Sequence, residues 1–170
     1  MIEWKIIKKW KTKSGLQAIA IMSITGNING YVKIPKSNQF YNMEYNVWNV
    51  SLEKYEDWTP LKIKKQRYIN DIEVHGGLTY GRLVETDDYL PKGYWFGFDT
   101  AHAGDSRNFD ESMKYFGNTE EDIKEVNKIS DIYKDSLMFP GDTYKDLNYV
   151  INECESLAAQ LNTKKIKKKT

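Results

Sequence analysis

Cysteine and histidine are both scarce in this chain, and each scarcity limits the chemistry that it can perform. The 170 residues include one cysteine, Cys154, so an internal disulfide and a cysteine-built zinc knuckle are excluded. A reducing cytoplasm is therefore the expected compartment. Histidine occurs only twice, as His75 and His102, so any imidazole chemistry must use these two residues.

Long apolar runs and export signals are also missing. No apolar stretch approaches the roughly 18 residues that a membrane-spanning helix requires. The first residues, from Met1 to Lys5, lack the apolar segment of a secretory signal. We therefore expect no membrane partner and no export.

The familiar catalytic signatures are absent as well. The chain has no Walker loop, no Gly-x-Gly-x-x-Gly, no His-Glu-x-x-His, no Gly-x-Ser-x-Gly and no Cys-x-x-Cys. No cofactor is predicted on this basis. Residue types that can hold a metal do occur in one polar part of the chain, namely His75, Asp99, His102 and Asp105. Their spacing carries no metal-site signature, so no metal is predicted.

A strong excess of one charge is lacking, since the formal net charge is +1. Five lysines lie within residues 164–170, and without them 20 basic residues stand against 24 acidic ones. A net acidic body binds nucleic acid poorly, because non-specific affinity comes mainly from phosphate neutralisation. Nucleic acid is therefore not expected as a partner. The lysine-rich end is expected to be a solubilising or frayed terminus, with a polyanion-binding arm as the alternative.

The chain does have enough apolar surface for one core. Hydrophobic residues make up 40% of it and aromatic residues 14%, in a length ordinary for a single domain. We predict one α+β domain over residues 1–162, followed by a basic C-terminal tail over residues 163–170. The domain is expected to be a mainly antiparallel sheet with two C-terminal helices packed on it. The sequence is also compatible with a homo-oligomer.

Apolar patterns and turn residues predict the first part of the sheet. Residues 4–10 and 16–22 are expected to form a hairpin with Ser14 and Gly15 in its turn. Residues 31–35 alternate as a third strand that ends at a proline. The following stretch, residues 37–60, is irregular and rich in aromatic side chains, so we expect a loop with at most one short helix. Its aromatics are expected to pack, with stacking on a planar ligand as the alternative.

Two further strands are predicted beside the polar segments. Residues 71–75 alternate, which predicts a strand with His75 on its polar face. Residues 80–81 are expected to lead into a loop. Residues 94–99 alternate again, with one face formed by Tyr94, Phe96 and Phe98. Asp99 falls on the other face, beside a bare glycine that leaves it room.

Two helices are predicted near the C-terminus. Thr119 and the acidic residues after it are typical of a helix start, and this helix is expected to run to about Lys134. Asp142 or Thr143 is expected to cap a second helix. That helix carries one apolar stripe, formed by Leu147, Val150, Ile151, Cys154, Leu157, Ala158 and Leu161. Cys154 is therefore predicted to be an inert buried thiol.

Both histidines stand in glycine-containing polar segments, residues 75–81 and residues 97–105. Histidine titrates near neutrality and can exchange protons or hold a phosphate or carboxylate. We therefore predict that the two segments converge on one water-accessible site. The plainer alternative is that each imidazole is satisfied by nearby backbone.

The residues around the histidines suggest separate roles. Asp99 precedes His102 by three residues and Asp105 follows it by three, so either carboxylate could orient the imidazole for acid–base catalysis. Asp99 could equally cap only the turn after its strand. The candidate catalytic residues are His75, His102, Asp99 and Asp105. The candidate ligand-binding residues offer backbone N–H groups, hydroxyls or rings, and they are Gly76, Gly77, Thr79, Tyr80, Trp95 and Thr100.

Four blocks of sequence carry a resemblance. They are Gly30-Tyr31-Val32-Lys33-Ile34-Pro35, Val74-His75-Gly76-Gly77-Leu78-Thr79-Tyr80, the run from Tyr94 to Asp105, and the run from Tyr144 to Val150. Over about residues 30–161, the chain resembles a family of small uncharacterised proteins encoded by bacteriophages and their hosts. The resemblance implies a phage context, and so the host cell cytoplasm, but it implies no catalytic assignment.

Small phage accessory proteins often counter host defences, and several such defences signal through cyclic or ADP-ribose-derived nucleotides. By that analogy the first hypothesis is an anti-defence protein that sequesters a nucleotide-derived immune signal in a pocket lined by the two histidine motifs. The second is a metal-independent phosphodiesterase or related hydrolase, with His75 and His102 as acid and base. The third is a protein–protein inhibitor with a patch of exposed Trp and Tyr residues. The sequence leaves open whether the protein is an enzyme.

Overall fold

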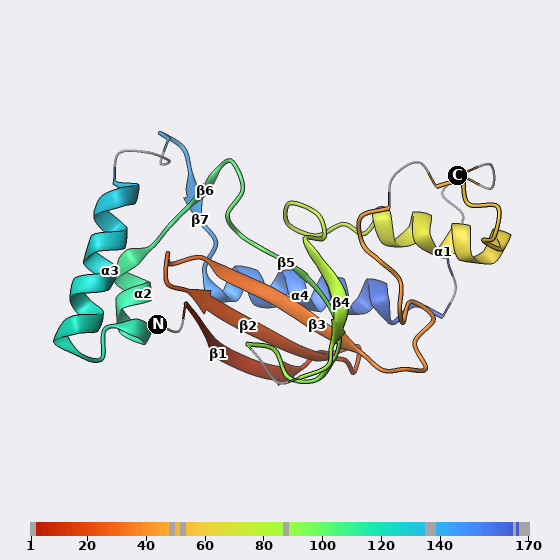
Figure 1. Ribbon diagram of the computed structural model, residues 1–170, viewed down its shortest axis with the longest axis horizontal. Helices are drawn as coiled ribbons and strands as arrows, with labels where there is room; N and C mark the ends of the chain where they lie inside the picture. The colour runs from red at the N-terminus through yellow and green to blue at the C-terminus, as the bar shows by residue number, and fades with distance from the viewer. Residues whose placement is uncertain are drawn as a thin grey trace.

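The computed structural model describes residues 3–47, 50–51, 54–86, 89–134, 139–164 and 166. At its centre lies a five-stranded antiparallel sheet with the strand order β1-β2-β3-β5-β4 (Figure 1). Its strands are β1 (Trp4–Lys11), β2 (Gln17–Ser23), β3 (Ile28–Ile34), β4 (Tyr80–Val84) and β5 (Gly93–Phe98). A small parallel pair joins β6 (Asp105–Ser106) to β7 (Thr143–Tyr144). The predicted α+β class with a mainly antiparallel sheet is confirmed.

The first hairpin forms where the sequence predicts it. β1 and β2 pair from Trp4 opposite Ser23 to Lys11 opposite Gln17, around a turn in which Gly15 has φ +92°. That left-handed conformation favours glycine, because a Cβ would strain it. The edge strand β4, which residues 80–81 begin before the chain reaches the next loop, was not predicted. Only Val84 of β4 is buried, so backbone pairing rather than apolar alternation defines the strand.

Helix α4 (Leu147–Leu161) packs on one face of the sheet, here called the inner face (Figure 1). Its buried stripe is formed by Val150, Cys154, Leu157, Ala158 and Leu161, as predicted. Gly30 of β3 permits the close approach of the helix, because a Cβ there would lie 2.6 Å from the Cys154 sulfur. The Cys154 side chain is fully buried, and burial raises the pKa of its thiol, which matches the prediction of an inert cysteine.

The start of α4 differs from the prediction. Asp146 caps the helix by accepting a hydrogen bond from the Tyr149 N–H, so neither Asp142 nor Thr143 is the cap. The physical reason is the short strand β7, in which Thr143 pairs with Asp105. The chain is therefore extended at this point and cannot enter the helix until Asp146.

Helix α3 (Glu120–Tyr133) forms where it was predicted, with a reciprocal capping box between Thr119 and Asp122. Its main neighbour is α2 (Phe109–Phe116), a helix that the sequence analysis missed. Asn108 caps α2, and Gly117 ends it. The polar character of the stretch after Asp105 concealed its short apolar stripe. Of the two predicted C-terminal helices, α4 thus packs on the sheet, whereas α3 packs on α2.

Helix α1 (Pro60–Asn70) was also missed, although Thr59 caps it and a proline opens it. The strand predicted at residues 71–75 was wrong, because this segment joins neither sheet. It is an extended connection after α1. Ile72 and Val74 alternate there because they pack against the inner-face core, and not because they belong to a strand.

The aromatic loop over residues 37–60 packs as predicted where it is described. Its described residues form turns and no helix. Phe40 stacks on Tyr68 with ring centroids 5.1 Å apart, and Tyr41 tilts against Tyr94 at the same distance. Trp48, also in this loop, lies outside the described residues.

The opposite face of the sheet, here called the outer face, carries a second and smaller core. Its buried members are Ile19, Ile21, Tyr31, Val84, Leu90 and Trp95. The alternation predicted for residues 94–99 is confirmed, because Trp95 belongs to this core while Tyr94, Phe96 and Phe98 belong to the inner one. Gly97 also matters here, since a Cβ at that position would lie 2.4 Å from the Tyr31 ring.

The predicted basic tail begins on the folded body. The Thr163 carbonyl accepts a hydrogen bond from Gln39, and Ile166 packs against the inner core. Lys165 and residues 167–170 lie outside the described part of the chain. Among the helices described, none combines the length and the apolar character that a membrane crossing needs.

Candidate functional site

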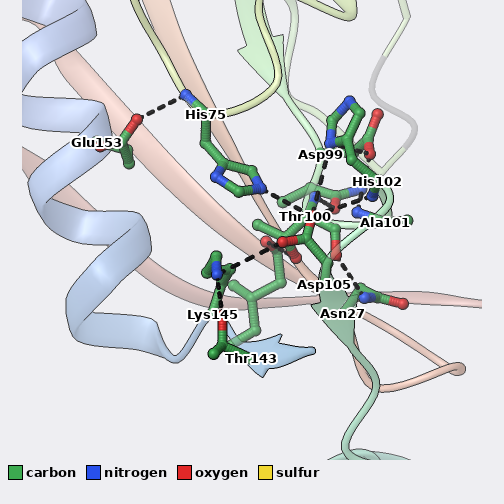
Figure 2. A network of polar contacts seen from close by, with 12 residues as sticks. Asn27, His75, Asp99, Thr100, Ala101, His102, Asp105, Thr143, Lys145 and Glu153 are labelled. Atoms are coloured by element: carbon green, nitrogen blue, oxygen red, sulfur yellow. Dashed lines mark hydrogen bonds and ion pairs between the residues drawn. The ribbon is translucent and has the colours of Figure 1, made fainter. Parts of the chain in front are cut away.

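Both histidines lie in one polar cluster beside the N-terminal half of α4 (Figure 2). The His75 and His102 rings are 5.6 Å apart between centroids, and Asp105 lies between them. The two segments thus converge as predicted, but on a largely buried cluster, in which the side chains of His75 and Asp105 are 15% and 3% exposed, and not on an open hollow. We call His75, His102 and Asp105 the histidine cluster.

Both ring nitrogens of His75 are occupied. Nε2 is 2.7 Å from Asp105 Oδ2, and Nδ1 is 2.8 Å from the Tyr149 hydroxyl. The His75 backbone N–H donates to Glu153 Oε2 at 2.6 Å. In this hydrogen-bonded arrangement His75 offers no free nitrogen to an organic ligand, so the role of direct acid or base that the sequence suggested does not fit this geometry. Its place in the network is that of a positioning residue for Asp105.

His102 is the more open of the two. Its side chain is 33% exposed, against 15% for His75. Nδ1 lies 3.5 Å from Asp99 Oδ1 and 3.6 Å from Asp105 Oδ2, which are ion-pair distances rather than hydrogen bonds. This nitrogen is sealed from solvent and has no hydrogen-bond partner among the described residues. The exposed remainder of the ring can meet a ligand.

Asp105 is the hub of the cluster, and its side chain is only 3% exposed. Burial alone would raise the pKa of this carboxyl. Hydrogen bonds from His75 and from the His102 backbone N–H, with the positive charge of Lys145 nearby, outweigh burial and lower the pKa. The ionised carboxylate can accept a hydrogen bond from His75 Nε2 when that nitrogen carries the ring proton.

Local backbone geometry fixes the two histidine segments. Gly76 has φ +65°, and a Cβ there would lie 2.2 Å from the His102 ring. Glycine is therefore required at this position both for the backbone and for ring packing. Thr100 anchors the other segment, since its hydroxyl donates to the Ile28 carbonyl at 3.0 Å and its own carbonyl accepts from Asn27 at 2.6 Å.

Three residues that contact the histidine cluster were not predicted from the sequence. Lys145 lies 3.6 Å from Asp105 Oδ1, while Tyr149 and Glu153 contact His75. A usable signal was present for two of them, because Tyr149 and Glu153 are spaced four apart and share one side of α4, next to its apolar stripe. Lys145 precedes the helix cap and carries no such signal.

A hollow of about 450 Å³ lies on the outer face, on the other side of Asp99 from the cluster. It is lined by Trp4, Ser23, Thr25, Asn27, Asn29, Tyr31, Thr79, Tyr80, Asp99 and Ala101. Neither histidine lines it. Asp99 therefore belongs to both regions, facing His102 and the hollow at once. It also accepts a hydrogen bond from the Ala101 N–H at 3.0 Å, so the predicted turn-capping role is real as well.

Aromatic rings form one wall of this outer-face hollow. Tyr31 and Tyr80 meet edge to face with ring centroids 5.3 Å apart. The Trp4 ring, also in the lining, has its centroid 6.3 Å from that of Tyr89. Burial raises the pKa of Tyr31 to about 12, so its hydroxyl stays protonated at neutral pH. A smaller hollow of about 210 Å³ shares Tyr80 and contains Arg82, whose guanidinium donates to the Tyr80 hydroxyl at 2.8 Å.

The predicted ligand-binding residues thus divide into three groups. Thr79 and Tyr80 line the outer-face hollow. Gly76 contacts the His102 ring, whereas a Cβ on Gly77 would meet nothing within 4 Å. Trp95 and Thr100 are each 1% exposed, and their polar groups bond to the carbonyls of Pro91 and Ile28. These last two residues therefore support the fold and cannot contact a ligand, which corrects the prediction.

Comparisons with known proteins gave no relative: no family model, no curated protein and no solved structure matches this chain. The function of the chain is therefore inferred from the chemistry of the cluster and the hollow.

Proposed function

We propose that this protein binds a nucleotide-derived small molecule, with the nucleoside portion in the outer-face hollow. The observation that carries the proposal is the combination of Tyr31, Tyr80 and the Asp99 carboxylate in one hollow of about 450 Å³. Aromatic rings can contact a base, and a carboxylate accepts hydrogen bonds from ribose hydroxyls. The volume is within the usual range for small-molecule sites, roughly 300–1,000 Å³.

Arg82 suits the charged part of such a ligand. It stands in the smaller hollow that adjoins the larger one at Tyr80. A guanidinium binds phosphate oxygens through paired N–H groups, whereas the larger hollow has no lysine or arginine among its lining residues. The phosphate is therefore assigned to Arg82, and not to the two histidines as the sequence suggested.

We propose the same biological role for this binding as the sequence suggested, namely the removal of a host immune signal. The protein would sequester an immune signal in the cytoplasm of a host cell, as a phage-encoded countermeasure. The inhibitor hypothesis requires a patch of exposed Trp and Tyr residues, to which Tyr94 and Trp95 cannot contribute because they are buried, whereas Trp4 is exposed.

A hydrolase is the second candidate, and Asp99 is the observation that favours it. This carboxylate lines the hollow and also faces His102 Nδ1 at 3.5 Å. A histidine oriented by a carboxylate can act as a general base toward a neighbouring ligand. In this reading His102 is the catalytic residue, whereas His75 positions Asp105.

Calorimetry against cyclic dinucleotides, cyclic trinucleotides and ADP-ribose derivatives tests the binding proposal. We expect at least one of them to bind, and Asp99→Asn to weaken that binding by about 10- to 100-fold, because a hydrogen bond to a charged group is lost. The asparagine oxygen can still cap the turn at Ala101. Asp110→Asn, on the exposed side of α2, is the matched control and should bind as the wild type does.

No heat with any of these compounds, or equal affinity for wild type and Asp99→Asn, would contradict the proposal. Chromatography of the ligand released from denatured complex then separates the two candidates. Intact ligand means sequestration, and a cleaved product means hydrolysis.

A further inference from the structure

We propose that His75 Nε2, His102 Nδ1 and Asp105 Oδ2 form a binding site for a first-row divalent cation of the zinc type. Each of the three residues offers one ligand atom, and these atoms lie within 4.8 Å of one another. Two of the separations are 2.7 Å and 3.6 Å, measured from Asp105 Oδ2 to His75 and to His102. Tetrahedral zinc, bound at about 2.0–2.1 Å, holds its ligand atoms about 3.3 Å apart. Small side-chain rotations would therefore bring the three atoms into a coordination shell.

The buried His102 nitrogen is a separate reason to expect a ligand. Nδ1 is closed to solvent and makes no hydrogen bond with any described residue, yet it faces the carboxylates of Asp99 and Asp105. An unpaired buried polar atom costs free energy, so native structures usually supply it with a partner. A cation between Nδ1 and the Asp105 carboxylate would satisfy it.

The groups around the three atoms are those that hold metal ligands in place. The Tyr149 hydroxyl lies 2.8 Å from His75 Nδ1 and can accept its N–H, which leaves the Nε2 lone pair for a metal. The His102 backbone N–H donates to Asp105 Oδ2 at 3.0 Å. Glu153 holds the His75 backbone. Each prospective ligand is thus already oriented.

Charge and ligand type indicate which cation fits. Asp99 and Asp105 supply two negative charges, and Lys145 contacts Asp105 through Oδ1, the oxygen that the site does not use. Imidazole ligands favour zinc and its first-row neighbours over magnesium and calcium. Asp99 or a water would complete a four-coordinate shell. The inference does not depend on the outer-face hollow or its ligand.

Zinc titration of tag-free, chelator-treated protein tests this inference by calorimetry. We expect one zinc to bind per chain, with a loss of affinity of 100-fold or more in His102→Ala. Tyr149→Phe should weaken binding by about 10- to 100-fold, as removal of an outer hydrogen bond does in known zinc sites. Asp110→Asn is the matched carboxylate control and should bind as the wild type does. Magnesium and calcium should give no comparable signal.

Equal zinc affinity for the wild type and His102→Ala would overturn the inference. A second measurement needs no variant, because the chain contains only two imidazoles. Zinc should shift the ¹⁵N resonances of His75 Nε2 and His102 Nδ1, and leave His75 Nδ1 protonated. Zinc that instead shifts His102 Nε2, or neither histidine, would also overturn it.

Discussion

The histidine cluster and the outer-face hollow meet at Asp99, but they differ in how many of their polar atoms already contact other groups of the protein. In the cluster both His75 nitrogens and both Asp105 oxygens have neighbours in the protein. In the hollow the Tyr80 ring and the Asp99 carboxylate line an open space. The difference indicates that the cluster can admit only a very small ligand, whereas the hollow can admit an organic molecule.

The largest effect is expected at Gly76, where substitution acts on the cluster alone. Gly76→Ala adds a Cβ 2.2 Å from the His102 ring at φ +65°, so we expect a loss of about 2–4 kcal/mol in the free energy of unfolding and weaker zinc binding. Chemical denaturation measures it. Gly77→Ala is the matched control, with φ +81° but no neighbour within 4 Å, and should cost only about 1 kcal/mol. Equal losses would show that the His102 ring does not pack against Gly76.

A smaller effect, confined to the other region, is expected at Gly97. Gly97→Ala places a Cβ 2.4 Å from the Tyr31 ring, which lines the outer-face hollow. We expect a loss of about 1–3 kcal/mol in stability from overpacking, together with weaker nucleotide binding. Zinc affinity should stay at the wild-type value. If both affinities fell together, the two regions would have to be treated as one site.

The smallest effect is expected when a thiol reagent is added to the folded protein, because Cys154 lies between α4 and the inner face of the sheet. Its thiol is fully buried and its pKa is raised by burial, so a thiol reagent should not label the folded protein at neutral pH. Labelling should appear only as denaturant unfolds the chain, which mass spectrometry can follow. Rapid labelling of the native protein would mean that α4 opens away from the inner face.

The sequence predicted those elements that have their own local signals. The stripe of α4 and the capping box of α3 follow from residue spacing, and the first hairpin follows from its turn. Strand β4 was missed because backbone pairing, rather than apolar alternation, defines it, whereas α2 was missed because its apolar stripe is short and lies in a polar stretch.

The site residues were also predicted only where a local sequence signal marks them. Polar residues beside glycines pointed to His75, His102 and Asp105, and these do converge. What the sequence could not give was the face on which each neighbour lies. Trp95 and Thr100 are close in sequence to the site but point into packed interior, whereas Trp4 and Asn29 reach the hollow from distant strands.

A crystal soaked with the tightest-binding compound of the nucleotide panel tests the central claim most directly. The account predicts difference density for the nucleoside between Tyr31, Tyr80 and Asp99, with the phosphate toward Arg82. Density for the organic ligand at the histidine cluster, or away from both regions, would contradict it.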